Sequence, residues 1–306
     1  MKHNTHIYIA RKAIDFLYDG LGNLYPESSI SGHKETRKKA RAVGKVLQRL
    51  LNNHKADVSE ASWAPDDILR DNRLYHIFKL FTEEEFTDYA DFFKETHTKQ
   101  DINYYRASGG GGLPYRVEHL ARGIRDMKKL RGYNDNYSVK QMMYQLLLLS
   151  HYVVDAHVPM HCDIRDDRPS AAKPSQGNYY KESWHAKIEK MWDDACTPVG
   201  IQEGCLERER AQDRLVDTAL TPFVTFDLSN SNHIKEIQTC HVEHDDLMDF
   251  MIDVCITSKQ RSQRLFPLST PDDVSFGDDF NVLTREIFAA AIGNLISVWI
   301  CIWRDR

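Results

Sequence analysis

Apolar residues recur along most of the chain at the three- and four-residue steps of an α-helix. The first such stretch places Ile7, Ala10 and Ile14 on one side, after Asn4 or Thr5 as a helix cap. No alternation typical of β-strands persists, and no internal repeat is found. The pattern predicts an all-α fold. Beyond the first helix, the expected helices cover about 35–53, 82–96, 114–130, 139–160, 179–196, 207–220, 233–264 and 279–304.

The chain of 306 residues has room for one large helical domain or two small ones. The loops at 165–176 and 265–278 have the character of excursions within a domain, so we expect a single multi-helix domain over residues 1–306. The longest apolar stretch, Phe288–Trp303, is shorter than the ~20 residues that cross a bilayer and contains Gly293 and Asn294. No membrane span is therefore expected. The N-terminus reads as the start of an amphipathic helix and not as a secretory leader.

Charge and cysteine content exclude some classes of function. The formal net charge of −5 gives no global basic field for nucleic acid or anionic lipid. The basic run at 34–41 is typical of the solvated face of a helix. The six cysteines form no CxxC pair, which argues against a zinc ribbon or a redox motif and leaves the compartment open.

The most informative segment is the apolar helix expected at 139–160. His151 and Asp155 are four residues apart and therefore share one helix face. Burying a histidine and a carboxylate in an apolar setting is costly unless they are paired or bound to a cation. Pro159 cannot donate to the carbonyl of Asp155, so the helix should kink or stop there, which would let His161 turn back toward the pair.

A second pair with the same spacing lies farther along the chain. His185 and Glu189 are four apart on the helix expected at 179–196. Either pair alone is most often a salt bridge or a satisfied core pair. Together with His161, the two pairs offer imidazole and carboxylate donors from two helices, a set that suits zinc. His157 points elsewhere on its helix, and the donors at 240–245 fall on a polar helix.

These residues carry a resemblance to a known family. The stretch from His151 through Asp155 to His161 reads HxxxD-x5-H with a Pro-Met-His end, and His185 with Glu189 gives a downstream HxxxE. The chain resembles the bacterial zinc-dependent phospholipases C and the related single-strand-specific zinc nucleases, which share one all-α fold. Further similarities in the same order are His6 at the start of a helix, Asp66 after Trp63-Ala64-Pro65, His76 as the following histidine, and the closing residues 299–306. The resemblance covers the whole chain, with insertions near 97–113 and 196–278.

The resemblance implies two or three zinc ions. By analogy Asp66, His76, His151 and Asp155 would hold the first, and His161, His185 and Glu189 the second. His6 and Asp155 would hold the third, which in the family is completed by the amine and carbonyl of an N-terminal tryptophan. This chain has Met1 in that place. Three alternatives follow: Met1 supplies the ligands that the tryptophan supplies in the family, His3 substitutes for them, or the third site is weak or empty.

The expected function is zinc-dependent hydrolysis of phosphate esters, with Asp66 orienting the attacking water. The HxxxE motif and the C-terminal similarity favour a phospholipase C-like phosphodiesterase acting on phospholipid. A nuclease or nucleotidase acting on single-stranded nucleic acid is the alternative. It would need an aromatic pocket to stack a base, for which Tyr75, Phe78, Tyr104, Tyr105 and Tyr115 are available, although aromatic residues at this density are usually core.

A third interpretation is a helical zinc protein without catalysis. Structural zinc sites are usually closed by four protein ligands, whereas the second site has three in this assignment, which favours an enzyme. No obligate protein partner is expected. Family members are usually secreted, yet no leader is visible in this chain, so the compartment stays open.

Overall fold

The computed structural model is helical in most of the residues it describes, and no β-strand occurs among them. The only ladder-like pairings in this part are two isolated bridges, Phe78 with Gly111 and Leu80 with Asp163. The all-α class predicted from the periodicity is therefore confirmed for the described part. That part comprises residues 1–19, 33–80, 111–130, 136–163, 184–196, 226, 230–240, 242–243, 245–265 and 278–304.

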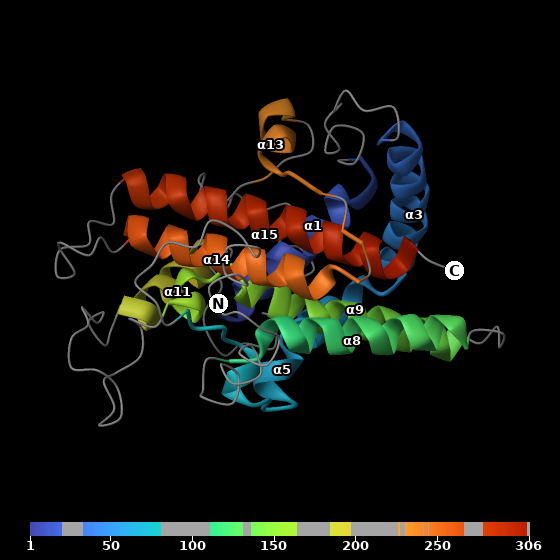
Figure 1. Cartoon of the computed structure of the whole chain (residues 1–306), viewed down its shortest axis with the longest axis horizontal. Helices are drawn as coiled ribbons and strands as arrows, with labels where there is room; N and C mark the ends of the chain where they lie inside the picture. Colours follow the sequence, from blue (N-terminus) through green and yellow to red (C-terminus); the bar gives the residue numbers. More distant parts are fainter. Residues whose placement is uncertain are drawn as a thin grey trace.

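Helix α9 (Asn136–Asp155) lies at the centre of the molecule (Figure 1). It packs against α8 (Leu113–Lys129), α15 (Asp278–Arg304) and α1 (His3–Asp19). Residues on every side of its second half, from Leu146 to Val154, are buried, as its nearly continuous apolar sequence predicts. The site residues at the end of this helix are therefore held in a dry, closely packed setting.

Helix α15 is long and apolar enough, over Asp279–Arg304, to cross a membrane by length and composition alone. Of the apolar window in this helix, 83% is buried inside the molecule, against α1, α3, α8, α9 and α14. This is the burial expected of a core helix. The helix itself matches the sequence prediction of 279–304 to within one residue.

The remaining helices surround this centre (Figure 1). Helix α3 packs on α1 and α15, α14 packs on α8 and α10, and α11 packs on α1. Short turns of helix between α3 and α8 carry part of the site. The bounds are α3 His33–Asn53, η1 Lys55–Asp57, α4 Val58–Ala61, α5 Ala64–Asp67, η2 Arg73–Tyr75, α10 Pro159–Cys162, α11 Trp184–Ala195, α13 Ser231–Glu236 and α14 Leu247–Leu265.

The break predicted before Pro159 is present. Helix α9 ends at Asp155, a turn closes with a hydrogen bond from the Val158 amide to the Asp155 carbonyl (3.0 Å), and α10 begins at Pro159. Val158 has extended backbone (φ −78°, ψ 110°), the conformation favoured before proline. The turn redirects the chain so that His161 faces back toward α9.

The single helix predicted over 233–264 is wrong. The structure has α13 (Ser231–Glu236), then non-helical backbone that is extended at Ile237, and then α14 (Leu247–Leu265). Tertiary contacts override the helical propensity of this segment: the Cys240 amide donates to Ser297 Oγ (3.0 Å), and the Gln238 carbonyl lies against Gly293 of α15. The polar helix expected to carry the donors at 240–245 is therefore absent from the described residues.

Other predicted elements lie outside the described residues. These are the helices at 82–96 and 207–220, the start of the helix at 179–196, and most of both insertions, 97–113 and 196–278. The assignment of residues 1–306 to one domain stays a prediction.

Gly293 allows α15 to approach the segment after α13. A Cβ atom built on Gly293 would lie 1.9 Å from the Gln238 carbonyl oxygen, a backbone atom that cannot swing aside. We therefore expect Gly293→Ala to lower the free energy of unfolding by about 2–3 kcal/mol, measured by urea denaturation. Gly123 in α8 is the control, because its added Cβ would meet nothing within 4 Å. Gly123→Ala should raise stability by about 0.5–1 kcal/mol through helix propensity. Equal effects of the two changes would contradict the close contact at Gly293.

Candidate metal centre

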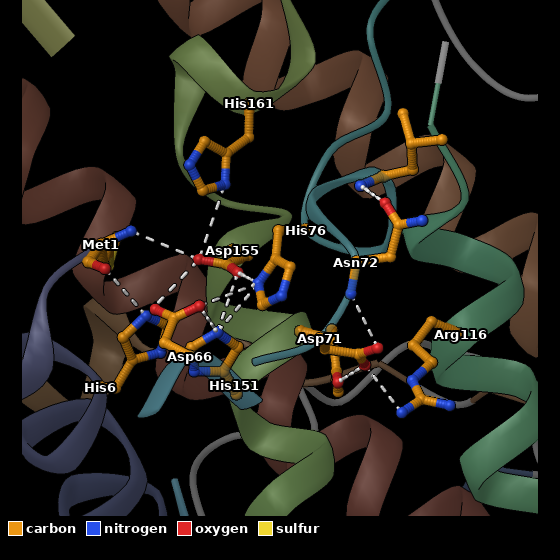
Figure 2. Close-up of polar contacts among 12 residues, drawn as sticks. Met1, His6, Asp66, Asp71, Asn72, His76, Arg116, His151, Asp155 and His161 are labelled. Atoms are coloured by element: carbon orange, nitrogen blue, oxygen red, sulfur yellow. Dashed lines mark hydrogen bonds and ion pairs between the residues drawn. The ribbon is translucent and has the colours of Figure 1, made fainter. Parts of the chain in front are cut away.

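The carboxylate of Asp155, at the end of α9, is the centre of a cluster of histidines (Figure 2). Its Oδ2 lies 2.9 Å from His76 Nδ1 and 3.2 Å from His151 Nε2. Its Oδ1 lies 3.5 Å from His6 Nε2 and 3.6 Å from His161 Nδ1. The side chain is 2% exposed. One buried carboxylate thus faces four imidazoles that come from four separate segments of the chain.

The first donor group comprises Asp66, His76 and His151, whose ligand atoms lie within 4.8 Å of one another. Asp66 Oδ1 is 3.6 Å from both His76 Nδ1 and His151 Nε2, and these two nitrogens are 3.1 Å apart. His151 Nδ1 is 2.9 Å from the Ser62 carbonyl, to which it must donate. This hydrogen bond fixes the tautomer of the neutral ring, in which the lone pair of Nε2 is directed at the group, as is usual for metal-binding histidines.

Local structure places the members of this group. Pro65 lies in the first turn of α5, a position that suits its fixed φ, and this turn presents Asp66. His76 directly follows η2, whose start is capped by the Asn72 side chain accepting from the Leu74 amide (3.0 Å). The Leu113 amide donates to the Ile77 carbonyl (3.3 Å), which ties the segment around His76 to the start of α8.

The second donor group comprises His161, His185 and Glu189. Glu189 Oε1 lies 3.1 Å from His185 Nε2, one helical turn earlier on α11, and 3.6 Å from His161 Nε2 on α10. The Phe78 amide donates to the His161 carbonyl (3.0 Å) and fixes α10 against the segment that carries His76. The two i, i+4 pairs seen in the sequence therefore meet through His161.

The third donor group comprises His6, His151 and Asp155. The rings of His6 and His151 are stacked, with centroids 4.0 Å apart. Backbone atoms of Met1 adjoin this group: the carbonyl oxygen is 3.2 Å from His6 Nε2, and the nitrogen is 3.3 Å from Asp155 Oδ1 and 2.8 Å from Glu189 Oε1. His3 instead lies beside the Trp63 ring (5.4 Å between centroids) and belongs to none of the three groups.

The structure brings all eight predicted site residues into these three groups. The grouping differs from the prediction in two respects: His151 belongs to both the first and the third group, and Asp155 belongs to the third group alone, although its Oδ2 faces His76 and His151. One nitrogen that faces the cluster, His161 Nδ1, is buried at 3.6 Å from Asp155 Oδ1 and has no hydrogen-bond partner among the described residues. Buried polar atoms normally have partners, so this nitrogen fits a centre that binds metal ions.

The charges of the cluster depend on one another. Burial alone would raise the pKa of Asp155, but His151, the Met1 amine and His161 hold that pKa well below its usual value. Burial would lower the pKa of His151, but Asp155 and Asp66 outweigh it and raise that pKa to about 9. Burial lowers the pKa of His6 to about 3 and that of His161 to about 4. His6 and His161 are thus neutral near pH 7, as a metal ligand must be.

A hydrogen-bonded network behind the first group was missed by the sequence analysis. Asp71 accepts from Arg116 (2.8 Å; Figure 2) and from Tyr152 Oη (2.5 Å). The Arg116 guanidinium lies over the rings of Tyr75 and Tyr152. Tyr152 follows His151 in the chain, and Tyr75 precedes His76. This network therefore supports the backbone next to two donors, after His151 and before His76. The only signal in the sequence is that adjacency.

Lys79 is a second support that the sequence did not reveal. It is almost fully buried, and its Nζ donates to the carbonyls of Met160 and Asp163, on either side of His161. A lysine between apolar residues gives no sign in the sequence of which carbonyls it will bind. Its role is to hold α10 in place.

His157 is not part of the cluster. Its Nδ1 lies 2.8 Å from the Val153 carbonyl and must donate to it, so Nε2 accepts from the Asn294 side-chain amide (2.9 Å). Both ring nitrogens are therefore satisfied, as in an ordinary core histidine. At 240–245, His241 and His244 lie outside the described residues, and Cys240 is exposed.

Asp193 of α11 anchors the start of α1 and so sets the position of His6. Its carboxylate accepts from the backbone amides of Asn4 (2.6 Å) and Thr5 (3.4 Å), which lie in the first turn of α1. We expect Asp193→Ala to lower the free energy of unfolding by about 1–2 kcal/mol, because these amides lose a charged acceptor. Urea denaturation measures this.

The neighbouring Asp194 provides the matched control for Asp193. It forms an exposed pair with Lys190 on the same helix, so Asp194→Ala should change stability by less than about 0.5 kcal/mol. Similar losses in the two variants would show that the anchor contributes nothing beyond a surface charge.

The chain was also compared with known proteins. The donor groups described above rest on the geometry of this chain alone, because comparison with protein-family models, with curated proteins and with solved structures found no match.

Proposed function

We propose that this protein is a zinc-dependent hydrolase of phosphate esters. The observation that carries the proposal is the arrangement of three groups of histidine and carboxylate donors around the single buried carboxylate of Asp155. Clusters of this kind, with neighbouring donor groups gathered around one carboxylate, suit two or more metal ions acting together on one phosphate.

The chemistry of the donors favours zinc. Every donor is an imidazole or a carboxylate, a set typical of catalytic zinc sites. Asp66, His76, His151 and Asp155 would hold one ion, and His161, His185 and Glu189 a second. His6 and Asp155 would hold a third, completed by Met1, whose backbone atoms adjoin this group while His3 does not. When bound, the zinc ions neutralise the charge of a phosphate ester and favour ionisation of the water that attacks it.

The exposure of the donors favours catalysis over a purely structural metal. Asp155 is 2% exposed, whereas Asp66 is 36% exposed and His185 is 26% exposed. The centre is therefore closed on the side of α9 and open at one member of the first group and one of the second. A structural zinc site is usually closed by four protein ligands. We assign to Asp66 the orientation of the attacking water, because its carboxylate combines exposure with contacts to His76 and His151.

We further propose that the substrate is phospholipid, as for a phospholipase C-like phosphodiesterase. This choice is based on the resemblance of the HxxxE motif and of the C-terminal residues to that family. One observation favours the nuclease as a second candidate. Tyr75 and Tyr115 line a common cavity of about 530 Å³ with Arg116, and Tyr75 precedes the donor His76. Aromatic rings beside a cation suit a stacked base. Phe78 is fully buried in the core, and Tyr104 and Tyr105 lie outside the described residues.

The test is hydrolysis by the zinc-loaded protein of three substrates: bis(p-nitrophenyl) phosphate, phosphatidylcholine in mixed micelles, and single-stranded DNA. We expect turnover of the chromogenic diester that is lost on chelation and returns with zinc. Turnover of the lipid or of the DNA then decides between the two candidates. If the zinc-loaded protein hydrolyses none of the three substrates, the proposal of an enzyme is contradicted. The remaining interpretation is then a helical zinc protein without catalysis.

A further inference from the structure

A cavity of about 600 Å³ lies among α13, α14 and α15. None of the residues that line it belongs to the three donor groups. Its wall is polar and charged on one part, with Arg261 of α14 and with Gln238 and Asn294, and apolar on another, with Ala289 and Ala290 of α15. The cavity thus combines a charged group with an apolar surface, as small-molecule sites do.

The carboxylates at this cavity already have cationic partners. Glu286 is paired with Arg264, which reaches both of its oxygens at 2.5 and 3.2 Å. Glu236 is paired with Arg285 at 2.5 Å. The charges of the cavity wall balance, with Arg261 and Arg285 against Glu236 and Glu286, but both carboxylates are paired with arginines other than Arg261.

Arg261 is the arginine of the cavity wall that neither of these carboxylates pairs with. It is half-buried, and no hydrogen bond or ion pair within 4 Å joins it to another side chain in the part of the chain that the structure describes. Burial lowers its pKa, Glu286 acts in the opposite direction, and Arg264 adds repulsion. An arginine stays protonated nonetheless and presents up to five N–H donors in a planar fork. Because no carboxylate holds it, this guanidinium can donate two N–H groups to an oxyanion that enters the cavity.

Contacts of two residues in the wall keep this cavity in shape. The Asn294 side chain is held by its hydrogen bond to His157, and the backbone of Gln238 lies closely against Gly293. Ala289 and Ala290 present small apolar groups next to the charge. A ligand with an oxyanion at one end and an apolar body would match both parts of the wall.

We propose that this cavity is an anion-binding site, separate from the metal centre, in which Arg261 binds the phosphate or carboxylate group of a small molecule. The planar fork of the guanidinium matches two oxygens of such a group. The apolar body of the ligand rests on the α15 surface at Ala289 and Ala290. The site does not depend on the proposed hydrolase activity.

The experiment measures binding of two probes, inorganic phosphate and benzoate, to the full chain by isothermal titration calorimetry. The protein is used both zinc-loaded and after chelation, because phosphate also binds zinc ions. We expect at least one probe to bind the chelated wild-type protein and Arg261→Gln to weaken that binding at least tenfold. Preference for phosphate or for benzoate identifies the oxyanion. Arg49→Gln, an exposed arginine on α3, is the matched control and should bind as the wild type does.

Two further measurements guard against misfolding. Arg261→Lys keeps the charge and should retain part of the affinity, while circular dichroism should show equal helicity in all variants. The bound probe should also raise the Tm of the chelated wild type and not that of Arg261→Gln. The proposal is overturned when neither probe binds the chelated wild type, or when Arg261→Gln binds as tightly as the wild type does. Loss of hydrolysis with anion binding intact would sink the proposed function alone.

Discussion

Replacing Asp155 with asparagine is expected to lower zinc content by at least one ion per chain and turnover of bis(p-nitrophenyl) phosphate by on the order of 10³-fold. The two oxygens of Asp155 face different donors: Oδ2 faces His76 and His151, and Oδ1 faces His6 and His161. An amide has nearly the same shape, but it lacks the negative charge and has only one oxygen. The change therefore weakens more than one donor group at once. Atomic emission and steady-state kinetics measure the two effects.

Asp126→Asn is the matched control for this variant. Asp126 lies exposed on α8, where it pairs with Lys129, so the same chemical change should leave zinc content and turnover as in the wild type. Asp155→Asn with full zinc content and ordinary turnover would refute the shared role of this carboxylate. Circular dichroism shows whether a loss of zinc is due to a chain that no longer folds. In that case Asp66→Asn is the second variant, because this donor is exposed and its replacement is less disruptive to folding.

The residues of the candidate site could be predicted because helical spacing brings them together. His151 with Asp155, and His185 with Glu189, are each four apart, and four residues is nearly one turn, so each pair had to share a face. Pro159 predicted the break that turns His161 back to the cluster. His6, Asp66 and His76 came only from the resemblance, because nothing in their own spacing shows that separate segments meet at Asp155.

What could not be predicted depends on contacts between distant segments. Asp71, Arg116 and Lys79 act on the site through partners 45 to 84 residues away in the chain, which no local pattern encodes. The helix predicted over 233–264 was wrong for the same reason, since its interruption follows from packing on Gly293 and Ser297 of α15. Local propensity is weak against such contacts. The unpaired state of Arg261 likewise depends on distant contacts, because Glu236 and Glu286 pair with Arg285 and Arg264.

Zinc binding to the first donor group should strengthen with pH by about tenfold per unit between pH 6 and pH 8 and level off above pH 9. The reason is the proton on His151. In the metal-free protein Asp155 and Asp66 raise its pKa to about 9 against the effect of burial, so near neutral pH a zinc ion must displace this proton. His6 and His161 release none, because burial has already lowered the pKa of each to about 3 and 4.

The stability of the metal-free protein should change with pH in the opposite direction to its affinity for zinc. The folded-state pKa of His151 is raised above its ordinary value of 6.5, so its contribution is fully present below pH 6.5 and is lost as pH rises through about 9. The pKa of Asp155 is lowered on folding, so the stability that this carboxylate contributes is present above its ordinary pKa and is lost only in acid. Between pH 7 and pH 9 the Tm of metal-free protein should therefore fall, while zinc, which binds neutral His151, should stabilise more as pH rises.

Competition with a chromophoric chelator, corrected for the protonation of the chelator, measures the affinity. Calorimetry in two buffers of different ionisation enthalpy counts the protons released. One proton released at pH 7 for the ion bound by His151, falling toward none above pH 9, is the expected result. An affinity independent of pH would mean that His151 is neutral in the metal-free protein, and the carboxylates of Asp155 and Asp66 would then have to be balanced by another cation.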